Sequence, residues 1–118
     1  MGAVSVDLPP VIVCHVTKVS DADTVTCRNG TRVRLAAVNA RERDGSCNHH
    51  PCPRMRHAQA QPIAAALMLG KVIRFRIVGT NGDRLVGEHY ATRCALFRSG
   101  AALPWVEYEQ AYKLRRCS

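Results

Sequence analysis

Two aspartates in the sequence, Asp21 and Asp23, are separated by a single residue and follow a strand-like run. On an extended segment, side chains two residues apart point to the same side, so the two carboxylates would lie close together. Paired carboxylates are typical of sites for hard cations such as calcium. Aspartates are also common in turns that bind no ion, and the pair by itself leaves both interpretations open.

Three more polar residues flank the next strand-like run: Arg34 lies within it, and Asn39 and Glu42 follow it. The apolar neighbours of Arg34 are expected to face the core, which turns the arginine outward. A single outward arginine is most often an ordinary solvated strand residue. Because Asp23 and these three residues all flank the ends of consecutive strands, a closed barrel would bring them to one place.

A second set of candidate metal ligands lies in the segment CNHHPC, residues 47–52, together with His57. Thiols and imidazoles at such short spacing bind zinc in many proteins. The gap between Cys47 and Cys52 equally allows a local disulfide, and His49 and His50 can be plain loop residues. The spacing alone does not decide between the two.

The six cysteines are an even number and a high density for 118 residues, which favours an oxidising compartment. Cys14 and Cys27 lie in two neighbouring β-branched runs that we expect to pair antiparallel. A turn at residues 20–21 would set Val16 opposite Val25 and Cys14 opposite Cys27, within disulfide range. Two buried free thiols are the alternative.

These residues must be positioned by short strands and helices. Asn29-Gly30 is the strongest turn signal, and a polar loop from 41 to 57 precedes an alanine-rich helix that ends at Gly70. That helix should begin near residues 59–61, because Pro62 is tolerated only in the first helical turn. The predicted strands are 11–19, 24–28, 31–38, 71–78 and 85–97 with a bulge at Gly87, and a second helix is predicted at 103–112 with Pro104 at its start.

Five short strands, a helix between the third and fourth, and a short C-terminal helix indicate an α+β fold, a five-stranded barrel of the OB type. We expect one domain over residues 1–118 with its core in 11–112, and a monomer. No run approaches the roughly 20 apolar residues that cross a bilayer, so we expect no membrane partner. The first ten residues lack the pattern of a signal peptide, although an initial Met-Gly can replace one, so the compartment stays open.

The chain carries 17 Lys and Arg against 9 Asp and Glu, a net charge of +8. Of these 17 basic residues 14 are arginine, whose planar guanidinium matches phosphate oxygens better than an ammonium group does. The composition favours a polyanionic partner such as nucleic acid. A basic surface that only aids solubility is the alternative.

The stretch VSDADTVTCRNGTRVRLAAVNARE, residues 19–42, resembles the signature of the thermonuclease family, the staphylococcal-nuclease-like OB-fold enzymes. In that family an Asp-Gly-Asp-Thr turn precedes an Arg-Leu strand that ends in Asp-Ala-Pro-Glu or Asp-Thr-Pro-Glu. The similarity runs from about residue 11 to 112 and includes the Gly70-Lys71 helix end, a turn with Arg84, and the segment from SGAAL to AY.

The resemblance implies one calcium ion per chain, bound by Asp23, Asn39 and the backbone carbonyl of Ala40, with Asp21 supporting the ion from farther away. The cysteines around GSCNHHPC resemble those of exported bacterial members, which implies a secreted or periplasmic protein. A disulfide between Cys47 and Cys52 fits such a member better than zinc does, so we expect no zinc. Elimination then leaves Cys94 to pair with Cys117.

The resemblance further implies that Glu42 activates the attacking water, and that Arg34 and Arg84 hold the phosphate. The turn NGDR has one residue more than the family's turn, which makes the alignment of Arg84 uncertain. Arg76 and Arg93 are therefore alternatives for the second arginine that holds the phosphate. We also expect Arg41, which replaces the family's proline, and Tyr112 to contact the substrate.

These features predict a calcium-dependent phosphodiesterase that cleaves DNA and RNA with little sequence preference. Asn39 replaces a charged aspartate ligand of the family, which should weaken calcium binding, and Ala22 replaces its glycine. A catalytically inactive OB-fold module that binds nucleic acid is therefore one rival. A zinc-stabilised interaction domain built on the cysteine and histidine loop is another.

Overall fold

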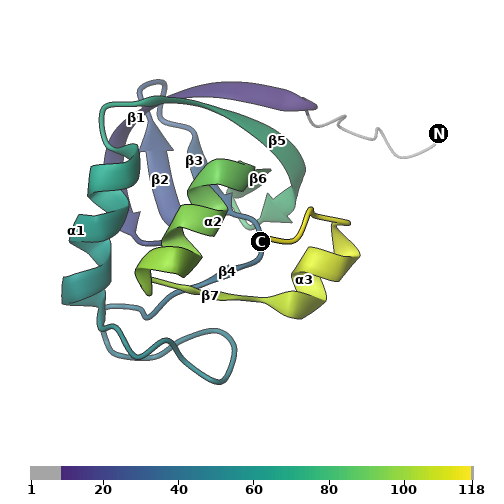
Figure 1. The fold of residues 1–118 in the computed structure, drawn as a ribbon. Helices are drawn as coiled ribbons and strands as arrows, with labels where there is room; N and C mark the ends of the chain where they lie inside the picture. Colours follow the sequence, from purple (N-terminus) through teal and green to yellow (C-terminus); the bar gives the residue numbers. More distant parts are fainter. Residues whose placement is uncertain (1–8, 118) are drawn as a thin grey trace.

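Five strands form the centre of the computed structural model, which describes residues 9–117. They close into a barrel in the order β1-β2-β3-β6-β5, and β5 pairs back onto β1 (Figure 1). Every pair is antiparallel except β3 with β6, which is parallel. The predicted α+β barrel of five strands is confirmed, and it is consistent with the OB fold. The barrel strands are β1 (Val11–Asp21), β2 (Thr24–Cys27), β3 (Arg32–Leu35), β5 (Val72–Asn81) and β6 (Arg84–Glu88).

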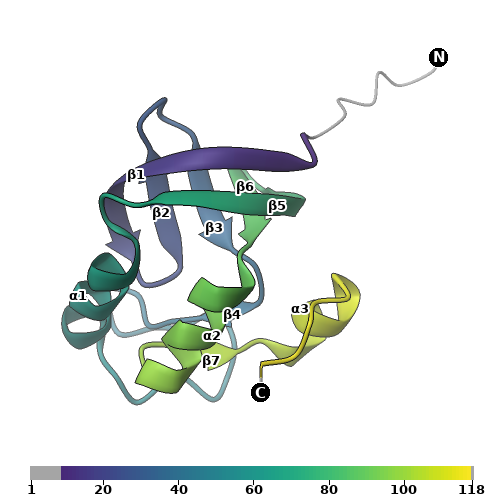
Figure 2. The same cartoon turned by 45° about the horizontal axis from the view of Figure 1, so that its top comes forward.

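The helices lie together at one side of the barrel (Figure 2). The helix α1 (His57–Met68) lies between β4 and β5 in the chain, and so between the third and fourth barrel strands that were predicted. The predicted C-terminal helix is α3 (Val106–Ala111), but it begins at Val106, and Pro104 lies in a short strand before it and not at the start of the helix. The remaining elements are α2 (Tyr90–Ser99) and two strands of two residues each, β4 (Val38–Asn39) and β7 (Leu103–Pro104), which pair with each other below the barrel.

The core fills the barrel because apolar side chains alternate along its strands. On β5, Ile73 and Phe75 are buried while Arg74 and Arg76 point outward, as the alternation predicts. Gly87 of β6 lies where this interior is tightest. A Cβ atom there would lie 2.8 Å from Cγ1 of Val33 and 2.9 Å from Cβ of Phe75, closer than packed carbons approach. Only glycine fits at this point of the barrel.

The turn between β1 and β2 differs from the prediction. Strand β1 continues to Asp21, and Val19, not Val16, pairs with Val25. Asp21 pairs with Thr24, which places the turn at residues 22–23. Because the turn lies two residues later than predicted, the predicted register is wrong; the ladder also has irregularities between Val16 and Lys18 and between Val19 and Asp21.

All three expected disulfides are nonetheless present. Cys14 bonds to Cys27 with a Cα–Cα distance of 5.1 Å, so the two predicted partners are correct although the register that suggested them is not. The other two bonds join Cys47 to Cys52 and Cys94 to Cys117. Three disulfides indicate an oxidising environment outside the cytoplasm. No helix within residues 9–117 is long and apolar enough to cross a membrane.

The predicted fifth strand, 85–97, is wrong beyond Glu88, and the bulge predicted at Gly87 is wrong too, because the irregularity lies between Ile77 and Gly79 of the partner strand β5. Strand β6 ends at Glu88, and α2 follows at once. The ring of His89 accepts a hydrogen bond from the backbone N–H of Thr92 and so caps the start of this helix. Gly100, with φ of 83°, ends it in the left-handed conformation that favours glycine.

Helix α1 begins earlier than predicted, at His57. The side chain of Gln59 accepts a hydrogen bond from the backbone N–H of Arg56 and caps the first turn. Pro62 consequently lies in the second turn, where it cannot donate to the carbonyl of Ala58. Ala58 is exposed, so water can satisfy that carbonyl.

Candidate functional site

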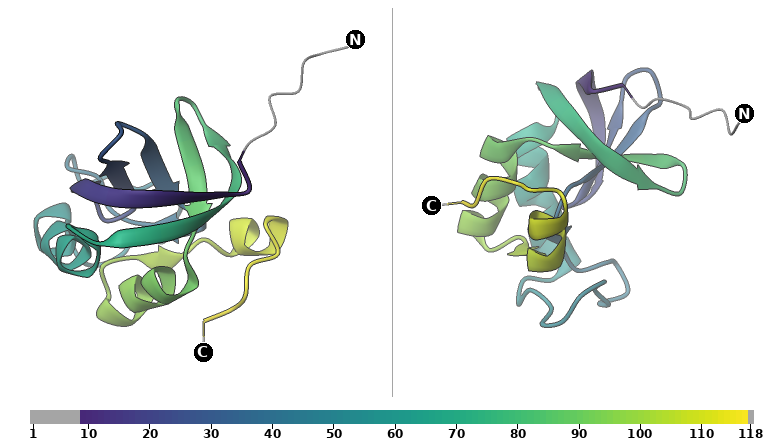
Figure 3. Two further views of the ribbon diagram at one scale, coloured as in Figure 1. Left: turned by 90° about the horizontal axis from the view of Figure 1, so that it is seen from above. Right: turned by 90° about the vertical axis from the view of Figure 1, so that its right-hand side faces the viewer.

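A groove of about 800 Å³ lies on the outer surface of β3 and β6. Its other walls are the tip of the β5–β6 hairpin, α3 and the loop between β4 and α1. The right-hand view of Figure 3 shows the hairpin above α3 and this loop below it. The residues that line the groove are Arg34, Leu35, Ala37, Val38, Glu42, Asn48, Thr80, Asn81, Gly82, Arg84, Val86, Trp105, Tyr108 and Tyr112.

Three predicted site residues form an acidic cluster at this groove. One carboxylate oxygen from each of Asp21, Asp23 and Glu42 lies within 4.8 Å of those of the other two. Asp21 ends β1, Asp23 lies in the turn before β2, and Glu42 follows β4. The backbone N–H of Leu35 donates to the carbonyl of Asp23 at 2.8 Å, which ties the aspartate turn to the end of β3.

Asp23 is almost fully buried, with 1 % of its surface exposed. Burial raises the pKa of its carboxyl above the usual value, and the Arg34 guanidinium only partly offsets this effect. Nη1 of Arg34 lies 3.4 Å from Oδ2 of Asp23, while Oδ1 accepts a hydrogen bond from the hydroxyl of Thr24 at 3.0 Å. The Arg34 contact is close enough for charge attraction, but Oδ2 has no hydrogen-bond partner among the described residues.

Glu42 is only half-buried and borders the groove directly. Its pKa is also raised, first by burial and then by the negative charges of Asp23 and Asp21, while Arg34 and His57 oppose the shift. A carboxylate with a raised pKa beside other carboxylates is a stronger base than an exposed one, which suits a group that removes a proton from water.

The cluster fits a hard cation. Oδ2 of Asp23 and Oδ1 of Asn39 are buried, and neither has a hydrogen-bond partner within the described residues. An unsatisfied buried oxygen costs about 1–3 kcal/mol, so the free oxygen of Asp23, which belongs to the acidic cluster, favours a positive ligand there, and the free oxygen of Asn39 likewise lacks a partner. Two oxygens that each lie about 2.4 Å from one calcium ion are at most about 4.8 Å apart, a limit that the three carboxylates meet. Asp21, Asp23, Glu42 and Asn39 are thus the side chains that could hold an ion.

Ala40, whose backbone carbonyl is a predicted ligand, follows Asn39 and is buried. The direction of that carbonyl toward the acidic cluster stays a prediction. The three-carboxylate cluster could hold a metal ion, and its geometry does not identify which one.

Two arginines lie in the groove. Arg34 extends from β3 with 8 % of its surface exposed, and Arg84 starts β6 directly after the hairpin turn at Gly82-Asp83. Both are near enough to Asp23 for their charges to lower its pKa. A phosphate in the groove would therefore meet two guanidinium groups beside the acidic cluster.

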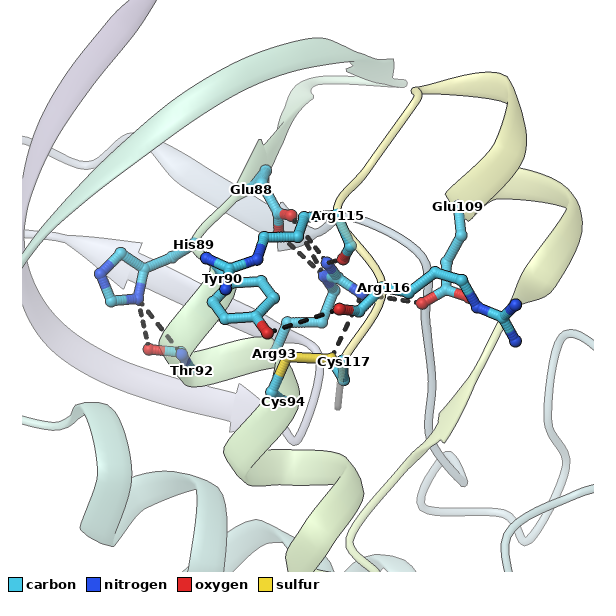
Figure 4. Close-up of a disulfide and its surroundings, with 10 residues drawn as sticks. All are labelled: Glu88, His89, Tyr90, Thr92, Arg93, Cys94, Glu109, Arg115, Arg116 and Cys117. Atoms are coloured by element: carbon cyan, nitrogen blue, oxygen red, sulfur yellow. Dashed lines mark hydrogen bonds and ion pairs between the residues drawn. A yellow bond between two sulfur atoms is a disulfide. The ribbon is translucent and has the colours of Figure 1, made fainter.

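The alternatives to Arg84 lie elsewhere. Arg93 is buried in α2, where its guanidinium bonds to Glu88 and Glu109 (Figure 4). Arg76 points outward from β5 and does not line the groove. Among these three arginines, only Arg84 shares a groove with Arg34.

The two residues predicted to contact substrate have different surroundings. Tyr112 lines the groove, and burial together with the neighbouring Tyr108 raises the pKa of its hydroxyl. Arg41 does not line the groove. Its guanidinium donates hydrogen bonds to the carbonyls of Pro53 and Gly45 in the loop. Substrate contact by either residue stays a prediction.

Sequence reasoning missed three residues at the site. Nε2 of His57 lies 2.8 Å from Oδ1 of Asp21, a contact between residues 36 positions apart that leaves no trace in the sequence. Trp105 lines the groove, where its ring contacts that of Tyr108 with centroids 4.7 Å apart. Two aromatic residues three positions apart on a short helix could have indicated this shared face.

Replacing Asp23 by asparagine should stabilise the protein when a chelator is present. The raised pKa means that the folded wild-type protein retains a proton that the unfolded chain loses near pH 3.8, so its free energy of unfolding falls as pH rises through this window. The asparagine variant avoids this loss, so its free energy of unfolding should exceed that of the wild type at neutral pH. Calcium should then raise the melting temperature of the wild type but not that of the variant.

Denaturant unfolding at several pH values, with and without calcium, measures both effects. Asp83→Asn is a suitable control, because that side chain is 76 % exposed and its replacement should change stability by no more than about 0.5 kcal/mol. An Asp23→Asn variant that is less stable than the wild type in chelator would show that the Arg34 pair outweighs the burial of the carboxylate.

Comparisons with known proteins found no relative of this chain. No family model matches the chain, no curated protein is detectably similar to it, and no solved structure matches it.

Proposed function

We propose that the protein is a calcium-dependent phosphodiesterase that hydrolyses DNA and RNA. The observation that carries this proposal is that Glu42, which belongs to the acidic cluster with Asp21 and Asp23, lines one groove together with Arg34 and Arg84. Cleavage of a phosphodiester needs a base for water and positive charge for the phosphate oxygens. The groove offers both within one set of side chains.

The division of roles follows from charge. Negative charge grows on the equatorial phosphate oxygens in the transition state, so two fixed guanidinium groups stabilise that state more than the ground state. Glu42 takes the proton of the attacking water. A bound calcium ion, held by Asp21, Asp23 and the amide oxygen of Asn39, would supply further positive charge at the phosphate.

The substrate range follows from what the groove contacts. Arginines that bind phosphate oxygens read no base sequence, so we infer little sequence preference. The net charge of +8 attracts any polyanionic strand. With three disulfides that require an oxidising compartment, the protein is proposed to act after secretion or in a periplasm.

The test is purified protein with end-labelled single-stranded DNA, first with calcium and then with an excess of a calcium chelator. We expect cleavage that stops on chelation and returns when calcium is restored. An Arg34→Ala variant purified in parallel controls for a contaminating nuclease, and its rate should fall about 10²- to 10³-fold. Equal cleavage with and without the chelator would exclude the proposed ion chemistry.

A binding module without catalysis is the second candidate, and Asn39 favours it. The amide group of Asn39 brings one neutral oxygen where an aspartate would bring a negative charge, so the ion is held less tightly. Retention of labelled DNA without any cleavage, at all calcium concentrations, would establish this second candidate.

A further inference from the structure

Glu42 is part of a tight turn in the loop that follows β4. Its backbone N–H donates to the carbonyl of Ser46 at 2.7 Å, and its carbonyl accepts from the N–H of Gly45 at 3.0 Å. These two bonds fix the backbone from which the carboxylate of Glu42 extends. We call residues 42–53 the disulfide loop, because the Cys47–Cys52 bond closes its middle part.

Arg41 joins the two ends of the disulfide loop. Its Nε donates to the carbonyl of Pro53 at 2.7 Å, and its Nη1 donates to the carbonyl of Gly45 at 2.5 Å. A guanidinium presents its donors in a rigid plane, so the two bonds fix the distance between the turn at Glu42 and the end of the loop. A lysine has no such planar fork.

Asn39 holds the middle of the disulfide loop. Its side chain is buried, and Nδ2 donates to the carbonyl of His49 at 2.6 Å and approaches that of Pro51 at 3.5 Å. Both partners are acceptors, which fixes the amide with Nδ2 toward the loop and leaves Oδ1 as the free oxygen. The ring of His49 stacks on that of Trp105 at a centroid distance of 5.2 Å and so attaches the loop to the opposite wall of the groove.

We propose that Arg41 and Asn39 are positioning residues that hold the disulfide loop rigid and thereby fix Glu42 in the acidic cluster. This inference rests on the proposed function, because it assigns the rigidity of the loop to the placement of the base. Both side chains direct their donors to loop carbonyls. Arg41 then contributes to the chemical step without contact with the phosphate.

Kinetics distinguish this role from a phosphate contact. A positioning residue lowers kcat and leaves KM and the salt dependence of binding unchanged. A phosphate contact instead raises KM, and its removal lowers the slope of log K against log salt concentration by about one. The two roles thus predict opposite patterns for the same substitution.

The experiment compares Arg41→Met and Arg41→Lys with the control Arg43→Met. Arg43 is exposed on the same loop, and its side chain makes no hydrogen bond within residues 9–117. We expect kcat on single-stranded DNA to fall about 10- to 100-fold in both Arg41 variants with KM unchanged, and to stay near the wild-type value in the control. Full activity of Arg41→Lys, or a raised KM in Arg41→Met, would overturn the proposal in favour of a charge contact.

A second measurement does not depend on catalysis. Amide hydrogen exchange should become faster at Glu42 and Gly45 in both Arg41 variants, because their N–H groups belong to the turn that Arg41 holds. Barrel amides should keep their protection, which shows that the variants are folded. Unchanged exchange in the turn would reject the positioning role even if the wild type cleaves DNA, and faster exchange would support it even if the wild type cleaves nothing.

Discussion

Replacing Glu42 by glutamine is expected to lower kcat for phosphodiester cleavage by about 10²- to 10⁴-fold, the range over which a general base contributes. Glutamine has nearly the same shape but cannot accept a proton from water. The burial and the neighbouring carboxylates that raise the pKa of Glu42 are what make it an effective base in the proposed mechanism. Arg34 and Arg84 remain in the variant, so the affinity for a strand should change little.

The rate is measured on single-stranded DNA with saturating calcium, and the affinity with the same DNA in a chelator. Glu107→Gln is the matched control, because that carboxylate is 67 % exposed on α3 and lies outside the acidic cluster. It should leave kcat unchanged. If Glu42→Gln retains more than about a tenth of the wild-type rate, Glu42 is not the base, and the water must be activated by another group.

The sequence predicts those site residues that lie close to one another along the chain. Asp21, Asp23, Arg34 and Glu42 all lie within 22 consecutive residues, at the ends of strands that pair with their chain neighbours. Short connections leave few ways to arrange such strands, so the residues at their ends must meet. Arg84 comes from a distant hairpin, and a difference of one residue in its turn left three arginines as alternatives.

The fold follows the same rule. Strands with clear alternation, such as β5, are predicted with their correct faces, because one side must be buried. The prediction for segment 85–97 failed because α2 has little apolar periodicity: its buried residues are Thr92, Arg93, Cys94 and Leu96, which do not form a single apolar stripe. A buried arginine contradicts the usual sequence pattern of a helix, and only its ion pairs with residues of other elements explain it.

The bonds around the disulfide loop could not have been predicted. Arg41 and Asn39 both donate to main-chain carbonyls about ten residues away, and every residue type carries such a carbonyl. A hydrogen bond to backbone therefore leaves no signal at the acceptor position. Both partners of a disulfide, by contrast, must be cysteine. Only a few pairings are therefore possible, and Cys14 and Cys27 were predicted correctly although the predicted strand register was wrong.

The buried guanidinium of Arg93 connects three separate segments of the chain, as Figure 4 shows. Its Nε lies 3.0 Å from Oε1 of Glu88 at the end of β6, and its Nη1 lies 2.8 Å from Oε2 of Glu109 on α3. Its Nη2 also donates to the carbonyl of Arg115, two residues before the cysteine that bonds to Cys94. The ion pairs of Arg93 and the Cys94–Cys117 disulfide thus jointly hold the C-terminal segment against α2.

Replacing Arg93 by methionine should lower the free energy of unfolding by about 3–5 kcal/mol, because the carboxylates of Glu88 and Glu109 would stay buried without their cation. Arg98→Met is the matched control on the same helix: Arg98 is exposed in the last turn, and its loss should cost no more than about 1 kcal/mol. Denaturant unfolding with the disulfides intact measures both. A loss in Arg93→Met no larger than in the control would mean that Cys94–Cys117 alone holds the C-terminal segment, and that the two carboxylates reach water when the arginine is removed.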